Sequence, residues 1–247
     1  QAPSVSKTEV RRALEELGQR WAKAVEELRR SGLSIYSLPW YLLIGEPQSG
    51  KSTTLRNSDL EFPVGTEALS GGGGTRNCDW WFTNEAVVLD TAGRFSFQEK
   101  NAPDKDEWEA FLGLLKKYRR NCPINGVIIV VPCTSLLSDT PEQLEEKAEN
   151  IRNKLSQVQR FLEIQFPIYL LVTKCDIILG FTEFFTKLSA GERRQLVGWS
   201  NAEQFTRPFD PKRFSEVFDS LSAKVHQLRM RFLCDEISVR EVDKLFV

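Results

Sequence analysis

The residue types best suited to chemistry stand together between Gly45 and Ser52, where the chain reads GEPQSGKS. The pattern G-x-x-x-x-G-K-[ST], called a phosphate loop or Walker A motif, fits this octet, which directly follows the apolar run 40–44. Its glycines let the backbone curl so that successive N–H groups point at phosphate oxygens, and its lysine adds a positive charge. The predicted cradle consists of Gly45, Glu46, Pro47, Gln48, Ser49, Gly50, Lys51, Ser52 and Thr53. An ordinary glycine-rich turn between a strand and a helix, with a solvated lysine, is the alternative.

An acidic motif, Asp90-Thr91-Ala92-Gly93, follows the apolar run 87–89. A carboxylate in this place can hold Mg²⁺ through water, while the Ser52 hydroxyl ligates the ion and the Gly93 amide faces a γ-phosphate. A plain turn after a strand would explain the same residues. The phosphate loop earlier in the chain favours the nucleotide interpretation.

A glycine run at 71–74 precedes Thr75 and Arg76. GTP-binding proteins carry a switch threonine between the phosphate loop and the acidic motif, and this threonine closes onto Mg²⁺ when the γ-phosphate is present. A flexible loop without such a role explains Thr75 equally well. Arg76 is placed either to reach a phosphate or to pair with a surface carboxylate.

A third polar motif, Thr173-Lys174-Cys175-Asp176, follows the apolar run 168–172. The lysine stem can lie along a purine, and Asp176 can accept hydrogen bonds from N1 and N2 of guanine, which adenine does not offer as donors. The motif therefore favours GTP or GDP over ATP. A polar loop at the end of a strand is the alternative.

The elements that must position these motifs alternate between strands and helices. The pattern predicts an amphipathic helix up to Gly32, strands at 38–44, 127–131 and 168–172, a hairpin of 78–82 with 86–89, and a helix opened by Thr140. The two later strands are expected to be buried, and the chain is helical beyond 182. We predict an α/β fold of three layers with a mostly parallel sheet, divided into 1–32, 33–181 and 182–247. Ligands bind beyond the carboxyl ends of such strands.

Composition excludes several classes of protein. The 247 residues are 41% hydrophobic, which suffices for a core, and the net charge of −1 gives no basic surface for nucleic acid. The longest apolar run is too short to cross a bilayer. Five cysteines without C-x-x-C spacing and a single histidine argue against zinc and disulfide frameworks, so a reducing cytosolic compartment is expected. Because the chain begins at Gln1, we expect a fragment of a longer protein.

With these motifs in order, the central region resembles the P-loop GTPase superfamily. The segments 38–45, 74–82 and 89–94 also resemble the IcmF/TssM family of type VI secretion, over roughly residues 33–199. This resemblance implies an inner-membrane protein of the secretion membrane complex, attached through segments outside this chain, with this region on the cytoplasmic side. It also implies partners similar to TssL and TssJ, together with baseplate components.

The resemblance implies roles for individual residues. Lys51, Thr75 and Gly93 would be catalytic, Ser52, Thr75 and Asp90 would hold Mg²⁺, and Thr173, Lys174 and Asp176 would bind the base of GTP or GDP. Arg94 stands where many GTPases carry a glutamine that orients water, so hydrolysis is expected to be slow or to depend on a partner. Thr173 replaces a commoner asparagine, and the last GTPase motif has only a faint candidate at 200–202. The rival interpretations are a scaffold that works without nucleotide and an ATPase.

Overall fold

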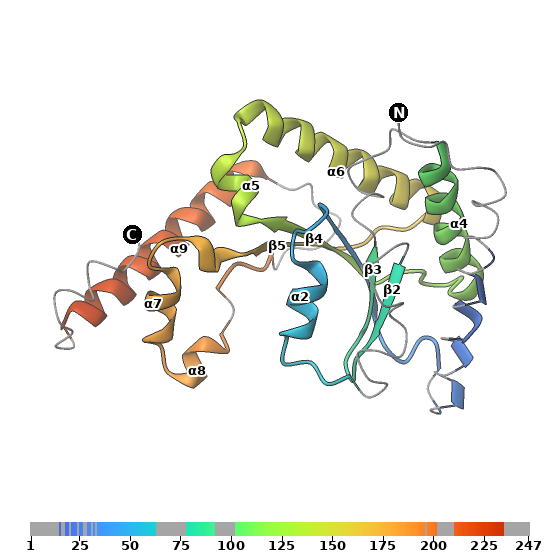
Figure 1. Cartoon of the computed structure of the whole chain (residues 1–247), viewed down its shortest axis with the longest axis horizontal. Helices are drawn as coiled ribbons and strands as arrows, with labels where there is room; N and C mark the ends of the chain where they lie inside the picture. Colours follow the sequence, from blue (N-terminus) through green and yellow to red (C-terminus); the bar gives the residue numbers. More distant parts are fainter. Residues whose placement is uncertain are drawn as a thin grey trace. The chain divides into compact units, whose positions relative to one another are not determined.

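The structure is a computed structural model of the whole chain (Figure 1). It describes residues 34–62, 78–91, 102–195, 197–201 and 210–234, together with scattered positions between 15 and 32. Thr75, Arg76, Gly93 and Arg94 lie outside the described residues. The chain divides into two compact units, 1–174 and 175–247, which are taken separately below. The predicted boundaries after residues 32 and 181 stay predictions.

A five-stranded sheet in the order β2-β3-β1-β4-β5 forms the centre of the first unit (Figure 1). Its strands are β1 (Trp40–Gly45), β2 (Cys78–Phe82), β3 (Val87–Thr91), β4 (Gly126–Pro132) and β5 (Ile168–Thr173). β1 pairs in parallel with β3 and β4, β4 pairs in parallel with β5, and only β2 runs antiparallel, to β3. The predicted hairpin and mostly parallel α/β sheet are confirmed.

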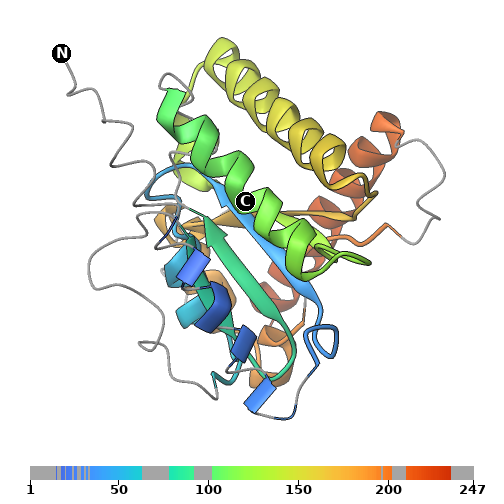
Figure 2. The ribbon, with the colours of Figure 1, turned by 90° about the vertical axis from the view of Figure 1, so that its right-hand side faces the viewer.

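Helices cover both faces of the sheet, as the predicted three layers require. On one face α4 (Ala102–Tyr118) and α6 (Pro141–Leu162) lie side by side (Figure 2). Their buried residues, which include Phe111, Leu112 and Val158, share a core with Leu42 and Ile44 of β1. The short helix α2 (Lys51–Arg56) covers the opposite face through a smaller cluster of Leu43, Leu55, Trp81, Val88 and Val130. The phosphate loop therefore joins a buried strand to a helix on the α2 face.

Helix boundaries follow the expected capping chemistry. The short helix α5 (Cys133–Ser138) comes directly after β4, and α6 then opens with a complete capping box between Thr140 and Gln143. Pro141 at the first helical position strengthens this start, because its missing N–H would have no partner there in any case. The predicted start of α6 at Thr140 is confirmed.

The N-terminal segment contributes an aromatic anchor to the first unit. Trp21 and Val25 occupy helical positions and are 0% and 4% exposed. The Trp21 ring lies 4.3 Å from the ring of Trp80 and 5.8 Å from that of Trp40, between centroids. Aromatic contacts of this kind add to the burial energy, so these residues pack on their own unit.

The strand β5 differs from its prediction. Its run of apolar residues, without polar residues in alternation, predicts burial on both faces. In the structure, however, residues Ile168 to Val172 are 37–58% exposed and only Thr173 is buried. Among the described residues β5 pairs with β4 alone, so it is an edge strand. The prediction of a buried strand is wrong because an apolar run does not say whether a further strand or helix covers it.

The second unit is helical, as predicted. It contains the 3₁₀ helix η1 (Cys175–Ile177) and the α-helices α7 (Phe181–Thr186), α8 (Ala190–Arg193) and α9 (Pro211–Cys234). Phe184, Leu188 and Phe232 form its buried core, and Arg231 of α9 pairs with Glu192 of α8 at 2.8 Å. Among the described residues, none of the helices combines the length and the apolar character needed to cross a membrane.

Candidate functional site

Parallel pairing brings the predicted motifs of the first unit to one edge of the sheet. Gly45 of β1 lies level with Val130 of β4, Leu43 lies level with Asp90 of β3, and Pro132 lies level with Thr173 of β5. The phosphate loop, the acidic motif and the start of the Thr173 motif therefore meet beyond the carboxyl ends of β1, β3 and β5. Ligands of open α/β sheets bind at this edge.

The two glycines of the loop are required by its geometry. A Cβ atom on Gly45 would lie 2.6 Å from the carbonyl oxygen of Val130, too close for any side chain. Gly50 has φ of +89° and forms the N-terminal boundary of α2, with no side chain capping the helix. That φ favours glycine, and Gln48 also adopts a positive φ of 60°. The loop thus has the curled backbone that directs N–H groups inward.

Lys51 occupies the centre of this loop. Its side chain is buried, with the residue 7% exposed, and its Nζ donates to the carbonyl oxygens of Gly45 at 3.0 Å and Glu46 at 2.8 Å. Burial lowers the pKa of the Lys51 ammonium, and the carboxylates of Asp90 and Glu46 oppose that shift. The loop carbonyls hold the ammonium group where a phosphate oxygen would replace them as its partner.

Ser52 and Asp90 form a direct pair next to this lysine. The Ser52 hydroxyl donates to Oδ2 of Asp90 at 2.5 Å, and Asp90 is fully buried at 0% exposure. Burial raises the pKa of Asp90 to about 6, although the Ser52 hydrogen bond and the Lys51 charge both lower it. Among the described residues, Oδ1 of Asp90 makes no hydrogen bond. A hydroxyl beside a carboxylate with an unused oxygen fits Mg²⁺, which prefers hard oxygen ligands and keeps several waters.

Thr173 ties the third motif to the loop. Its hydroxyl donates to the carbonyl oxygen of Ser49 at 2.6 Å, and Thr173 itself is 8% exposed. Lys174 follows with a positive φ of 58°, and its Cε lies 4.0 Å from the place where a Cβ of Gly50 would be. This hydrogen bond therefore stabilises the phosphate loop. Recognition of a nucleotide base by the Thr173 motif would not require it.

The remaining predicted residues are placed differently. Asp176 lies in η1 and is exposed, within the second unit. Pro47, Gln48 and Thr53 are exposed on the loop and on α2. Thr75 and Gly93 fall outside the described residues, so their predicted roles stay predictions.

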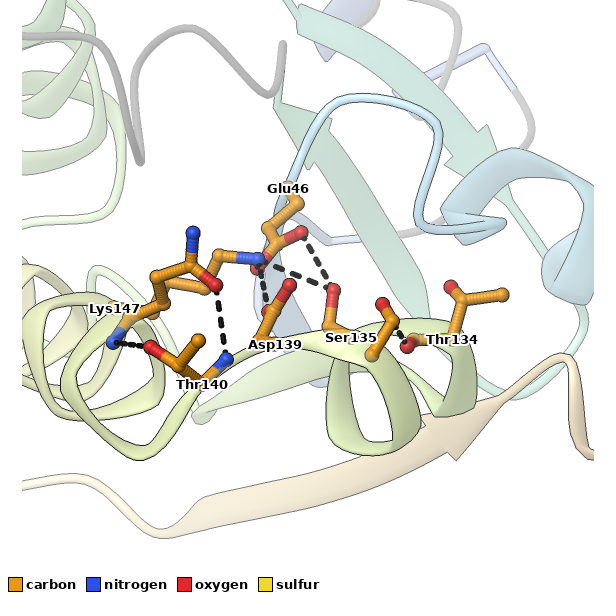
Figure 3. Close-up of polar contacts among 8 residues, drawn as sticks. Glu46, Thr134, Ser135, Asp139, Thr140 and Lys147 are labelled. Atoms are coloured by element: carbon orange, nitrogen blue, oxygen red, sulfur yellow. Dashed lines mark hydrogen bonds and ion pairs between the residues drawn. The ribbon is translucent and has the colours of Figure 1, made fainter.

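A charged cluster beside the loop was missed by the sequence analysis. Glu46 bonds to Ser135 of α5 and to Lys147 of α6, and Lys147 also pairs with Asp139 (Figure 3). One feature of the sequence indicates such a cluster: Glu46 places a carboxylate inside the phosphate loop, where a nearby cation is expected to neutralise it. Nothing in the sequence tells which lysine supplies that charge.

The fold and this site define an α/β protein of the P-loop class. A phosphate loop links β1 to α2 at the centre of a mostly parallel sheet, and Asp90 is the last residue but one of the neighbouring strand β3. The model of the IcmF-related N-terminal domain matches residues 101–247, more than half of the chain. The chain belongs to this family.

A curated relative is the type VI secretion system component TssM1 of Pseudomonas aeruginosa strain PAO1. It is 42% identical over 212 residues, which cover 81% of this chain and 19% of that protein. The chain thus spans about a fifth of the length of this relative.

Two solved structures are distantly similar. The G domain of the T. maritima FeoB iron transporter is 21% identical, with a TM-score of 0.30, over 56% of this chain and 74% of that one. A GTP-binding protein of Sulfolobus solfataricus in complex with GDP is 17% identical, with a TM-score of 0.32, over 77% and 55%. Scores this low carry no argument about ligands, and the fold class depends on the strand order and the loop.

Proposed function

We propose that this chain binds a guanine nucleotide, GTP or GDP, together with Mg²⁺, as part of a type VI secretion component. The observation that carries the proposal is the arrangement around Lys51. A curled loop, a buried ammonium group and the Ser52–Asp90 pair lie together at one edge of the sheet. Phosphate and a hard divalent cation are the ligands that such a set of groups favours.

Each group has a distinct proposed task. Lys51 neutralises the β- and γ-phosphates, Ser52 ligates Mg²⁺, and Asp90 supports the ion through water. Bound Mg²⁺ would neutralise charge on the phosphates. Thr173 keeps the loop in shape through its bond to the Ser49 carbonyl. The order of motifs further supports Thr75 and Gly93 on the phosphate side, and Lys174 and Asp176 on the base.

Turnover is a secondary part of the proposal. Lys51, Thr75 and Gly93 are the proposed catalytic residues, but Arg94 occupies the position of the usual water-orienting glutamine. Hydrolysis is therefore slow, or it depends on a partner that completes the site. The nucleotide then acts chiefly as a bound signal.

The family suggests where this signal acts. We propose that the nucleotide state influences assembly of the type VI secretion membrane complex. The proposed partners are subunits similar to TssL and TssJ, and baseplate components. The chain would lie at the cytoplasmic face of the bacterial inner membrane, attached through segments outside it.

The test is to measure GTP, GDP and ATP binding side by side by titration calorimetry with Mg²⁺, for the chain and for Lys51→Ala. We expect guanine nucleotides to bind more tightly than ATP and Lys51→Ala to lose binding. Equal affinity for ATP would overturn the guanine assignment. Unchanged affinity in Lys51→Ala would overturn the site itself.

A second candidate is a scaffold that works without nucleotide. It is favoured by one observation, namely that the Lys51 ammonium already bonds to two carbonyls of its own loop, so the loop is complete without an anion. GDP released on denaturing freshly purified protein would contradict this candidate. A lack of binding at millimolar GTP would support it.

A further inference from the structure

Glu46, the second residue of the phosphate loop, has both carboxylate oxygens engaged by neighbouring helices (Figure 3). Its Oε1 lies 2.8 Å from Nζ of Lys147, and its Oε2 accepts a hydrogen bond from the Ser135 hydroxyl at 3.1 Å. The Glu46 side chain is 18% exposed, so water reaches it only in part. These contacts turn a negative charge of the loop toward α5 and α6.

Lys147 is the centre of this cluster. Its Nζ also lies 2.6 Å from Oδ2 of Asp139 and donates to the Ser135 hydroxyl at 3.2 Å. Burial lowers the pKa of the Lys147 ammonium, but hydrogen bonds to Asp139 and Glu46 outweigh that effect and raise it overall. Lys147 therefore stays charged, and it is the cation shared by two carboxylates in the cluster.

The main chain of Glu46 takes part in the phosphate site itself. Its carbonyl oxygen accepts from Nζ of Lys51 at 2.8 Å and from the amide of Ser49 at 3.2 Å. One residue thus supports the phosphate lysine through its backbone while its side chain is held by Lys147. Fixing the side chain consequently fixes the first turn of the loop.

We propose that Lys147 is a positioning residue for phosphate binding, which holds and neutralises the Glu46 carboxylate so that the loop can accept an anion. The proposal rests on the proposed function, that this loop binds a nucleoside phosphate. Glu46 already acts electrostatically on Lys51. Without Lys147, the Glu46 carboxylate carries an unpaired negative charge that repels phosphate. The same carboxylate is then available to pair with Lys51, so it also competes with phosphate for that lysine.

The test compares Lys147→Met, which keeps the apolar stem and removes the charge, with the double variant Glu46→Gln/Lys147→Met. Titration calorimetry of the full chain with GDP and Mg²⁺ gives the affinities. We expect Lys147→Met to bind about tenfold more weakly, because an unpaired charge near the phosphates costs roughly this much. The double variant should recover most of the loss, because glutamine carries no charge to be neutralised.

The matched control is Lys116→Met. Lys116 pairs with Glu163 at 2.8 Å in the same unit, outside the phosphate loop, and both side chains are substantially exposed. This variant likewise removes one lysine charge, although Lys116 pairs with one carboxylate and Lys147 with two, and it should bind GDP as the parent chain does. A double variant that binds as weakly as Lys147→Met would overturn the charge mechanism, and unchanged affinity in Lys147→Met would overturn the proposal.

A second measurement separates this proposal from the proposed function. Amide hydrogen exchange at Glu46 and at residues 48–50 of the nucleotide-free chain reports directly on loop order. It should become faster in Lys147→Met and not in Lys116→Met. If the parent chain binds neither GDP nor GTP, the proposed function fails, and exchange alone then decides the role of Lys147. Equal exchange in both variants would contradict that role.

Discussion

Two cations of the first unit are buried at opposite ends of β1. Lys51 follows its carboxyl end and bonds to two loop carbonyls. Arg119, only 2% exposed, lies at its beginning, with its guanidinium carbon 4.7 Å from the ring centroid of Trp40 and 5.1 Å from that of Tyr36. Among the described residues Arg119 pairs with no carboxylate, and its polar partner is Asn125 Oδ1 at 3.3 Å.

The two cations differ in whether a ligand could replace their present partners. In the proposed function, phosphate oxygens replace the carbonyl partners of Lys51, since both kinds of oxygen are hydrogen-bond acceptors. The aromatic faces around Arg119 offer no such exchange, and one of them, Trp40, belongs to the core of the unit. Burial of a cation therefore does not define a binding site; the kind of partner does.

The largest effect is expected for Lys51→Ala. It should lower GDP affinity about a thousandfold, roughly 4 kcal/mol, because charge-assisted hydrogen bonds to phosphate are lost. The free energy of unfolding of the nucleotide-free chain should change far less. Calorimetry with GDP and Mg²⁺, together with urea unfolding, measures both quantities. A large loss of stability with retained affinity would make Lys51 a structural cation like Arg119.

Asp90→Asn should change the pH dependence of stability. The folded chain keeps the Asp90 proton up to pH about 6, whereas an ordinary aspartate releases it near 3.8. Unfolding free energy should therefore fall as pH rises from about 4 to 6, by at most about 3 kcal/mol from this group. Urea unfolding at several pH values without Mg²⁺ measures the slope. The asparagine variant should lose that part of it, and an identical slope in both proteins would contradict the burial of this charge.

Arg119→Met should lower the free energy of unfolding by about 2 kcal/mol, the value of a desolvated cation–π contact, and leave GDP affinity unchanged. Lys117→Met is the matched control, because Lys117 is exposed and lies 5.4 Å from the Tyr118 ring centroid. Its effect should stay within about 0.5 kcal/mol. Thermal and urea unfolding check the pair. A selective loss of GDP binding in Arg119→Met would break the contrast between the two cations.

The smallest effect is expected for Thr173→Val, which removes the bond to the Ser49 carbonyl and keeps the shape of the side chain. Unfolding free energy should fall by about 1 kcal/mol, with GDP affinity about threefold lower. Thr173→Ser keeps the hydroxyl and serves as the control. If both variants behave alike, the hydroxyl does not hold the loop.

Much of the fold was predictable because it depends on local patterns. The hairpin of β2 and β3, the capping box at Thr140 and the helical character beyond residue 182 all follow from nearby residues. The edge position of β5 was not predictable, because its aliphatic run is compatible with burial or with exposure. The site shows the same division. The order of the motifs predicts that Ser52 and Asp90 serve one site, and the structure adds their direct hydrogen bond. The bond from Thr173 to the loop was not predicted, because the sequence places Thr173 only in a base-reading motif, a role that stays a prediction.

The sequence by itself determined the chemical inventory: the phosphate-loop motif with Lys51, the residues Ser52 and Asp90 proposed to hold Mg²⁺, and the family to which the chain belongs. The tertiary structure alone decided which charges neutralise one another. Glu46 and Lys147 lie 101 positions apart in the chain, with three strands between them, and only the pairing of β1 with β4 and the packing that follows bring them within 2.8 Å. Local spacing fixes what a loop can bind, whereas long-range pairing decides which side chains hold it in shape.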